Sequence, residues 1–417
     1  MGLKMKKNIF FTVVVILLIS LLTLVITENC MSQWIQCSSG LEAGTVHALA
    51  VSGNNIFAGT QGLGIYLSTN NGQNWTHTAL NNKNISSLAV SGNYIFAGIW
   101  NSSGVYLSTN NGTTWTQTML NNKSVESLVV SGNNIFAGTT SYGVYLSTNN
   151  GQTWDQTALN SLSVCCLAVS GNNIFAGTGF GQGVYLSTNN GTTWTQTMLN
   201  NKTILSLAVS GNNSEDSGQV IFAGADENGV YLSTNNGTSW TQTALNNKSV
   251  HSIAINGNNI FAGVYWSGVY FSTNNGQNWI QKNQGFPSII TVYSLLIANN
   301  YIFAGTWGQY AWRRSLSEIT GIQNISTEIP AAYFLEQNYP NPFNPSTKIR
   351  FAIPKNEIVT LKIFDLLGRE VAVLVNEKLQ SGIYETDWNA SSHPSGVYFY
   401  SLNAGDFKQT KRMILVR

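Results

Sequence analysis

The acidic side chains are the first place to look for catalysis, because most glycosidases use two carboxyl groups held roughly 5 to 9.5 Å apart. Acids are sparse in the repeated part of the chain, and four of them are adjacent in sequence, Glu215 with Asp216 and Asp226 with Glu227. Adjacent acids among Asn, Ser and Gly are typical of solvated turns. Glu126 and Asp226 are the best pair that separate repeats could bring together, and we do not expect them to be catalytic. The acids considered are Glu42, Glu126, Asp155, Glu215, Asp216, Asp226 and Glu227.

The histidines are the candidate metal ligands of this chain. His47 and His251 occupy the same position in two repeats and could share a ligand site, but a structural or solvent-facing role is the simpler reading. His77 and His393 have no evident partner. The chain also lacks a P-loop, a dinucleotide-binding glycine motif, a nucleophile elbow and paired Cys-x-x-Cys motifs. We therefore predict a protein that is not an enzyme and has no metal site and no cofactor.

The four cysteines are Cys30, Cys37, Cys165 and Cys166. Neighbouring Cys165 and Cys166 would point to opposite faces of a strand, so the pattern indicates no disulfide framework. We expect the cysteines to serve as small buried apolar side chains.

Internal repetition dominates the sequence and sets the fold. The tetrapeptide Ile-Phe-Ala-Gly occurs seven times, and a tryptophan marks a second point of the same repeat seven times. One repeat is longer because residues 214–220 are inserted into a turn. The tetrapeptide starts at 56, 95, 135, 174, 221, 260 and 302, and the tryptophans are Trp34, Trp75, Trp115, Trp154, Trp194, Trp240 and Trp279.

Each repeat divides into four short β segments separated by turn residues, as a four-stranded antiparallel propeller blade requires. In the second copy the segments span 85–90, 95–98, 104–108 and 115–118. Inner segments are rich in Ala, Ser and Val, which suits the crowding near a central axis. The spacing thus predicts β structure throughout the repeats.

The phase of the repeats predicts how they close. Trp34 belongs to an outer segment that lacks its own first three strands, and the last tetrapeptide, at Ile302, has no outer segment after it. The N-terminal strand should complete the last blade and cover two free strand edges. We predict an all-β, seven-bladed β-propeller over residues 33–320, closed by the N-terminal strand, because an open solenoid would need capping repeats that are absent.

Residues that differ among the copies are the candidates for a specific site, because repeated residues do repeated structural work. One variable position lies where each inner strand begins, and others lie in the loops between second and third strands. In propellers both places belong to one end of the ring, which should also carry Lys83, Lys123, Lys202 and Lys248. Aromatic side chains beside neutral polar groups suit sugar stacking or recognition of a protein surface. The predicted ligand-binding residues are Trp100, Tyr142, Phe180, Asp226, Tyr265, Trp266, Trp307, His47, Glu126, His251 and Tyr293, and Ser86, Cys165 and Leu205 fill the remaining variable inner positions.

Six repeats share the turn sequence Ser-Thr-Asn-Asn-Gly-x-x-Trp, first at Ser68. It resembles the Asp-box, or bacterial neuraminidase repeat, of sialidase-like propellers, with Asn in place of Asp. We expect a structural role, in which Asn caps turn amides, Gly adopts a positive φ and Trp packs between blades. The residues are Asn70, Gly72, Trp75, Asn110, Gly112, Trp115, Asn149, Gly151, Trp154, Asn189, Gly191, Trp194, Asn235, Gly237, Trp240, Asn274, Gly276 and Trp279.

The resemblance does not extend to sialidase activity. Sialidases need clustered arginines for the substrate carboxylate, and the chain has no arginine between Thr45 and Ala311.

The repeats end and the composition changes after Thr320. A proline-rich stretch follows at 339–345. Alternating segments at 348–353, 359–365, 370–375, 382–388, 396–402 and 407–416 predict a small antiparallel β-sandwich. We assign residues 321–345 to a linker and proline-rich lead segment, and residues 333–417 to this second domain.

Residues 333–417 closely resemble the type A C-terminal sorting domain of the type IX secretion system. The match is carried by Asn-Tyr-Pro-Asn-Pro-Phe-Asn-Pro from Asn338, Phe-Asp-Leu-Leu-Gly-Arg-Glu from Phe364, Pro-Ser-Gly-Val-Tyr-Phe-Tyr from Pro394 and the terminal segment from Lys411. The resemblance implies an immunoglobulin-like fold, shared with hook-capping proteins, that the outer-membrane translocon reads. The cargo is then released or attached to surface lipopolysaccharide, with or without removal of the domain. Asp365, Gly368 and Arg369 are expected to be turn residues.

Residues 1–32 read as a signal peptide, because Lys4, Lys6 and Lys7 precede an apolar run over 9–26. An uncleaved membrane anchor is the alternative, and a lipoprotein signal fits poorly. Only 9% of residues are charged and the formal net charge is +2, which gives no reason to expect nucleic acid as a partner. Membrane contact is expected through the signal peptide only.

We therefore expect a secreted or cell-surface, non-catalytic propeller that binds a glycan or an envelope protein on its variable end, with the type IX translocon as a partner of its C-terminal domain. The alternatives are a carbohydrate-active enzyme, which would need a converging acid pair at that end, and a structural or assembly factor, which would show a broad protein-binding face.

Overall fold

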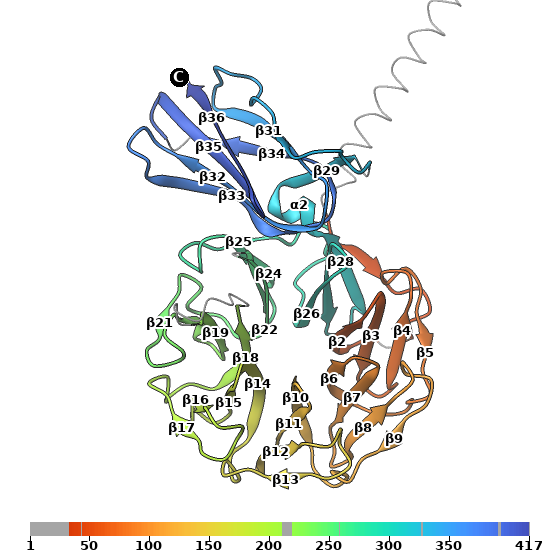
Figure 1. Ribbon diagram of the computed structural model, residues 1–417. Helices are drawn as coiled ribbons and strands as arrows, with labels where there is room; N and C mark the ends of the chain where they lie inside the picture. Colours follow the sequence, from red (N-terminus) through yellow and green to blue (C-terminus); the bar gives the residue numbers. More distant parts are fainter. Residues whose placement is uncertain are drawn as a thin grey trace, which may run out of the picture.

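A computed structural model describes residues 33–42, 44–210, 219–257, 259–326, 328–390 and 393–416 of the chain (Figure 1). The predicted signal peptide, with Cys30, and the acids Glu215 and Asp216 lie outside these residues. Over the residues that are described, no helix combines the length and apolar character needed to cross a membrane.

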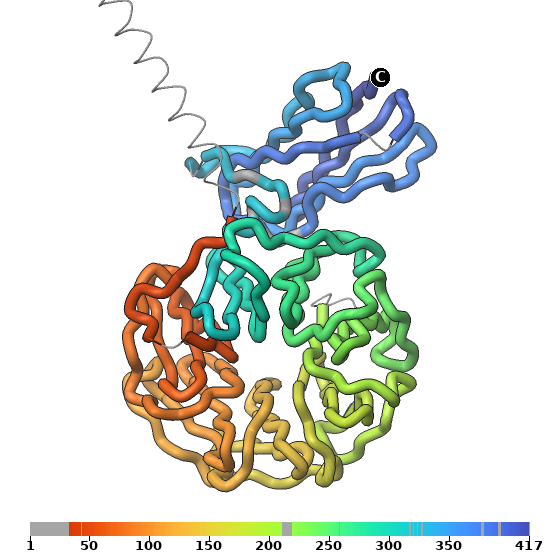
Figure 2. The backbone as a smooth tube through the Cα atoms, turned by 180° about the vertical axis from the view of Figure 1, so that it is seen from behind, coloured from red at the N-terminus to blue at the C-terminus, as the bar shows by residue number. Residues whose placement is uncertain are grey.

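Seven four-stranded antiparallel sheets stand around a ring, with the C-terminal domain on one side of it (Figures 1 and 2). The prediction of a seven-bladed propeller is therefore confirmed. The first three blades are β2 (Val46–Ser52), β3 (Asn55–Thr60), β4 (Ile65–Ser68) and β5 (Thr76–His77); β6 (Ile85–Ser91), β7 (Tyr94–Ile99), β8 (Gly104–Ser108) and β9 (Thr116–Gln117); and β10 (Val125–Ser131), β11 (Asn134–Thr139), β12 (Gly143–Ser147) and β13 (Asp155–Gln156). The next three are β14 (Val164–Ser170), β15 (Asn173–Thr178), β16 (Val184–Ser187) and β17 (Thr195–Gln196); β18 (Ile204–Val209), β19 (Ile221–Ala225), β20 (Gly229–Ser233) and β21 (Thr241–Gln242); and β22 (Val250–Asn256), β23 (Asn259–Val264), β24 (Gly268–Ser272) and β25 (Ile280–Gln281).

The seventh blade is assembled from both ends of the propeller. Its strands are β26 (Val292–Ala298), β27 (Tyr301–Thr306), β28 (Ala311–Ser315) and, from the N-terminus, β1 (Ile35–Cys37), which pairs antiparallel with β28. Trp34 fixes this closure, because it is 1% exposed, stacks on Phe286 at 4.8 Å and donates its indole N–H to the Lys282 carbonyl at 2.6 Å. The N-terminal strand therefore closes the ring, as the repeat phase predicts.

The repeated turn is held by two side chains that act together. In the second blade, the Asn110 Oδ1 accepts a hydrogen bond from the Thr114 amide at 2.9 Å, as expected for an Asx cap. The Ser108 hydroxyl accepts a second from the Gly112 amide at 2.8 Å, a role that the sequence reading did not assign. Gly112 has a φ of 82°, and a Cβ there would lie 3.0 Å from Phe57 of the preceding blade. The turn is therefore part of the packing between blades.

The C-terminal domain is a sandwich of two four-stranded sheets, β29-β34-β31-β30 and β33-β32-β35-β36. Large apolar side chains such as Trp388, Phe351 and Tyr400 fill the space between the sheets. The strands are β29 (Ile322–Ser326), β30 (Phe334–Leu335), β31 (Ser346–Ile353), β32 (Glu357–Phe364), β33 (Glu370–Leu379), β34 (Gly382–Asn389), β35 (Gly396–Ala404) and β36 (Phe407–Leu415).

The predicted linker over 321–345 needs correction, because β29, which precedes the predicted start of the second domain at residue 333, is a strand of the sandwich. The short helix α2 (Leu316–Thr320) buries Leu316 and Ile319 in the propeller core, and Ile322 is already buried in the sandwich core. Apolar anchors on both sides of Gly321 leave no free linker between the two domains. The sandwich therefore begins at residue 322, earlier than the predicted 333.

Candidate ligand-binding face of the propeller

Every inner strand of the propeller carries a β-bulge at the same point. In β2 the register shifts between Val46 and Ala48, so that His47 is the extra residue. Bulges re-aim a side chain and are frequent beside binding sites. The bulged residues all line a cavity of about 500 Å³ at the centre of the ring. They are His47, Ser86, Glu126, Cys165, Leu205, His251 and Tyr293, which are the variable inner positions identified in the sequence.

The loops between second and third strands share a second backbone feature, a positive φ at their second residue. Phe180 and Trp266 adopt it with φ of 55° and 50°, which is rare for a bulky side chain. Neighbouring blades hold the loops in place: the Trp266 amide donates to the Thr291 hydroxyl at 3.0 Å, and the Glu227 amide to the Ser249 hydroxyl at 3.0 Å. The seven positions are Gly62, Asn101, Ser141, Phe180, Glu227, Trp266 and Gly308.

Seven aromatic side chains from four adjacent blades form a continuous chain of ring contacts, which we call the aromatic arc. Consecutive ring centroids lie between 4.5 and 5.9 Å apart, and most neighbouring rings meet edge to face. Tyr265, Trp266 and Trp307, at one end, are 46 to 48% exposed. In order, the members are Trp100, His47, Tyr293, His251, Tyr265, Trp266 and Trp307, all of which the sequence predicted.

The two histidines of the arc are held in their neutral form. Burial lowers the pKa of His47 from 6.5 to about 4, with a smaller contribution from His251. Burial also lowers the pKa of His251, against the pull of Asp226. Tyr293 lies between their rings. Because both histidines are neutral, the arc is an uncharged surface at neutral pH.

The two predicted acids of this end, Glu126 and Asp226, form hydrogen bonds with different neighbours. Glu126 accepts hydrogen bonds from the Trp100 indole N–H and the Thr140 hydroxyl, both at 2.7 Å. Asp226, two blades away, accepts one from the Ser249 hydroxyl at 2.6 Å. No hydrogen bond or ion pair joins the two carboxylates among the residues described, and no group of three or more His, Cys, Asp or Glu side chains gathers there as a metal site would require.

Tyr142 and Phe180, from the third and fourth blades, lie outside the arc. Phe180 is 84% exposed, and Tyr142 is 48% exposed with the Lys123 ammonium 3.7 Å from its ring centroid. Lys123 also accepts a hydrogen bond through its carbonyl from the Gly104 amide, which places the loops between blades at the same end as the variable loops. The predicted residues therefore divide into an arc and two outlying aromatics.

A hydroxyl residue just before several inner strands also belongs to the site and was not among the predicted residues. Thr45, Ser163, Thr203, Ser249 and Thr291 each accept a hydrogen bond from a loop amide of the preceding blade. The sequence contains a pattern that could have predicted them, because a Ser or Thr followed by Val or Ile recurs at this position of the repeat.

Comparison with known proteins identifies the family of the C-terminal domain. Residues 337–416 match the family described as the secretion system C-terminal sorting domain. This domain is a type IX secretion sorting domain. The protein is accordingly exported, to the medium or to the outer cell surface, and its sorting domain interacts with the type IX machinery. No curated protein sequence matches the chain.

Among solved structures, PorZ of Porphyromonas gingivalis, described as a surface component of the type IX secretion system, is similar at 16% identity and a TM-score of 0.56. The match covers 91% of this chain and 60% of the PorZ chain, so this chain spans less than two thirds of that protein. YCF48 from Cyanidioschyzon merolae matches at 14% identity and a TM-score of 0.55, over 68% of this chain and 99% of its own. YCF48 bound to a D1 peptide matches at 14% identity and a TM-score of 0.53, over 68% and 96%. Identities this low establish a shared fold alone.

Proposed function

We propose that this exported propeller is a non-catalytic binding protein that holds a glycan or a protein ligand on its variable end. The aromatic arc is the observation that carries the proposal. It runs from the central cavity to three half-exposed rings at the surface, so a ligand can contact both together.

The chemistry of the arc fits a neutral, ring-bearing ligand best. Exposed faces of Trp266 and Trp307 can stack on the apolar face of a sugar, and the carboxylates of Asp226 and Glu227, on the corresponding loop of the fifth blade, can accept hydrogen bonds from sugar hydroxyls. A glycan is therefore the first candidate. Arginine, which selects carboxylate and phosphate groups, is absent from this end of the propeller.

The backbone conformation of Trp266 supports binding over packing. Two blades place glycine at this loop position, Gly62 and Gly308, whereas the sixth blade holds a half-exposed tryptophan at positive φ. Trp266 contacts the rings of Tyr265 and Trp307 but remains half-exposed, so part of its ring is open to a ligand. Strained backbone of this kind collects at ligand sites.

The competing reading as a glycoside hydrolase is weaker. Glu126 and Asp226 belong to the third and fifth blades and are each hydrogen-bonded to neighbours of their own. Hydrolysis of a bound glycan that Glu126→Gln abolishes would establish that reading instead.

A second candidate, a peptide-binding assembly factor, has one observation in its favour: a propeller of similar fold, YCF48, is described as bound to a D1 peptide. A peptide would present apolar side chains to the arc in the place of sugar rings.

The test is binding of the purified full-length chain to an array of bacterial surface glycans and to an array of envelope-protein peptides. The variant combines Trp100→Ala, Trp266→Ala and Trp307→Ala, and we expect at least tenfold weaker binding to whichever probe the native protein selects. The matched control combines Met119→Ala and Met198→Ala, 71% and 75% exposed on outer blade surfaces, and should bind normally. If the triple variant keeps every interaction, the arc is not the site. Binding confined to peptides would favour the assembly-factor reading.

A further inference from the structure

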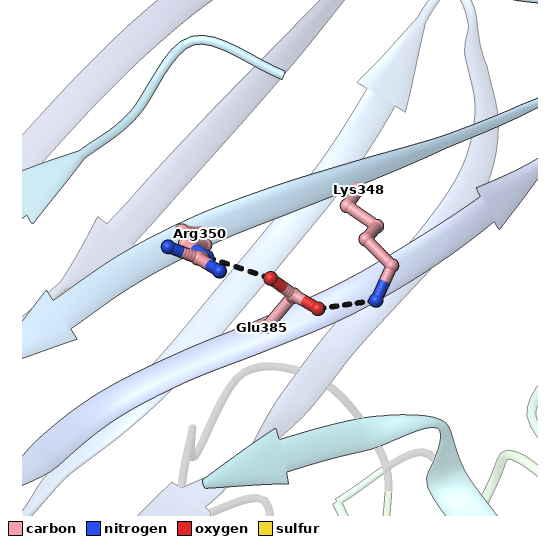
Figure 3. Close-up of polar contacts among 3 residues, drawn as sticks. All are labelled: Lys348, Arg350 and Glu385. Carbon is pink, nitrogen blue, oxygen red and sulfur yellow. Dashed lines mark hydrogen bonds and ion pairs between the residues drawn. The ribbon is translucent and has the colours of Figure 1, made fainter. Parts of the chain in front are cut away.

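The two outer faces of the sorting domain differ in chemistry. On the β31-β34 face, Glu385 lies between two half-exposed cations and accepts hydrogen bonds from the Lys348 ammonium at 2.5 Å and the Arg350 guanidinium at 2.6 Å (Figure 3). The Glu385 side chain is only 8% exposed. Charges on this face are thus paired with one another.

The opposite outer face, on β32, β35 and β36, is apolar at one end. The strand register places Phe364 opposite Phe399, and Val397 opposite Ile414, while the alternate residues of these strands fill the core. A surface hollow of about 330 Å³ lies beside Phe364 and Phe399.

Two leucines extend this apolar end into solvent. Leu366 and Leu367 form the turn between β32 and β33 and are 70% and 76% exposed in the whole chain, so the propeller leaves them uncovered. The turn is rigid, because Asp365 accepts hydrogen bonds from the amides of Leu367 and Arg369 at 2.9 and 3.0 Å and from the Arg369 guanidinium at 2.7 Å. Large apolar side chains held rigidly in water are typical of a docking surface.

The edges of this sheet are already occupied, which directs a partner to the face. Along β36, the Phe343 amide donates to the Ile414 carbonyl, and the Asn341 side chain accepts from the Ile414 amide, both at 2.9 Å. At the opposite edge, β33 lies nearest the ring, and Val373 and Asn376 share a narrow gap with the sixth blade (Figure 1). A partner therefore has no free edge of this sheet at these points on which to add a strand.

We propose that Phe364, Leu366, Leu367 and Phe399 form the surface by which an outer-membrane protein of the type IX machinery holds the chain during export. The partner that fits is a protein with an apolar recess for the leucines and an acidic rim, since exposed Lys408 and Arg412 border the apolar end. The membership of the domain in the sorting family requires such a contact with the secretion machinery, and this surface has the apolar area, rigidity and access to provide it.

The experiment is an export assay on the full chain in a bacterium that has the type IX system. The test variant is Leu366→Ser with Leu367→Ser, and the matched control is Ile358→Ser, an equally exposed aliphatic residue at the other end of β32 (67% exposed). We expect at least a tenfold fall in the fraction reaching the surface or medium, with accumulation in the periplasm, for the leucine variant only. Thermal unfolding of both purified variants should match the native chain, because neither position is packed.

A folded leucine variant that is exported normally overturns the proposal, as does equal loss in the Ile358→Ser control. A photo-crosslinking residue at 367, in an otherwise native chain, gives an independent reading: it should form an adduct with an outer-membrane secretion protein that the same residue at 358 does not form. Leucine-dependent sedimentation with anionic phospholipid vesicles, without such an adduct, would identify a membrane-binding surface and contradict a protein partner.

Discussion

Both ends of each blade repeat their own backbone conformation around the ring, but only one end also repeats its side chains. At the repeated turn, Ser and Asn recur because they accept hydrogen bonds from amides of the same turn, and Gly and Trp recur because they pack against the preceding blade. At the variable end, the bulge and the positive-φ loop residue recur in all seven blades, yet their side chains range from glycine to tryptophan. A repeated backbone with unrepeated side chains is expected where function, and not packing, chooses the residue. Substitutions at the two ends should therefore affect different measurements.

Ring closure should give the largest effect on stability. Trp34→Ala removes a buried ring, its stack on Phe286 and its hydrogen bond, and we expect a loss of about 3–5 kcal/mol in the free energy of unfolding. Chemical denaturation of the native and variant chains measures it. A loss below about 1 kcal/mol would mean that the N-terminal strand does not fasten the ring.

Substitution of a glycine that lies in close contact with neighbouring backbone should have the next largest effect on stability. A Cβ on Gly104, at φ 69°, would lie 1.8 Å from the Leu120 carbonyl oxygen, so Gly104→Ala should lose at least about 2 kcal/mol. Gly92→Ala is the control, because φ is 57° but nothing lies within 4 Å, and about 1 kcal/mol is expected. Equal losses would contradict the tight contact between strand and loop.

Acid should destabilise the variable end through His47. Above pH 6.5 this histidine is neutral both folded and unfolded, so it adds no pH dependence. Between 6.5 and about 4 the unfolded chain takes up a proton that the folded chain does not, and the free energy of unfolding should fall by at most about 1.4 kcal/mol per pH unit. Denaturation at several pH values should show a shallower slope in His47→Phe than in the native chain; an unchanged slope would contradict the buried neutral state.

The repeated asparagine should have a smaller, local effect. Asn110→Ala removes the acceptor for the Thr114 amide, and about 1 kcal/mol of stability should be lost, with ligand binding unchanged. Asn110→Asp keeps the acceptor and serves as the control. A binding defect in Asn110→Ala would connect the repeated turn to function and remove the distinction between the two ends.

The sequence predicted the architecture well because repetition reports it seven times over: the tetrapeptide, the tryptophan and their relative phase determine the blades and the closing strand. It also located the members of the arc, since variation at Trp266 or His251 is visible against repeated neighbours. It could not show that Tyr293 lies between two histidines or that Glu126 bonds Trp100, because these contacts depend on ring curvature across blades. The linker prediction was wrong because a short strand such as β29 gains its stability from pairing with β34, far away in sequence.

The Trp266→Gly variant, measured for both stability and ligand binding, separates function from packing at the variable end. Glycine suits the positive φ of this loop, so the free energy of unfolding should stay within about 1 kcal/mol of the native value, while binding to the array-selected probe should weaken at least tenfold. Loss of stability with unchanged binding would show that Trp266 is a packing residue and that the variable end does not bind the ligand through it.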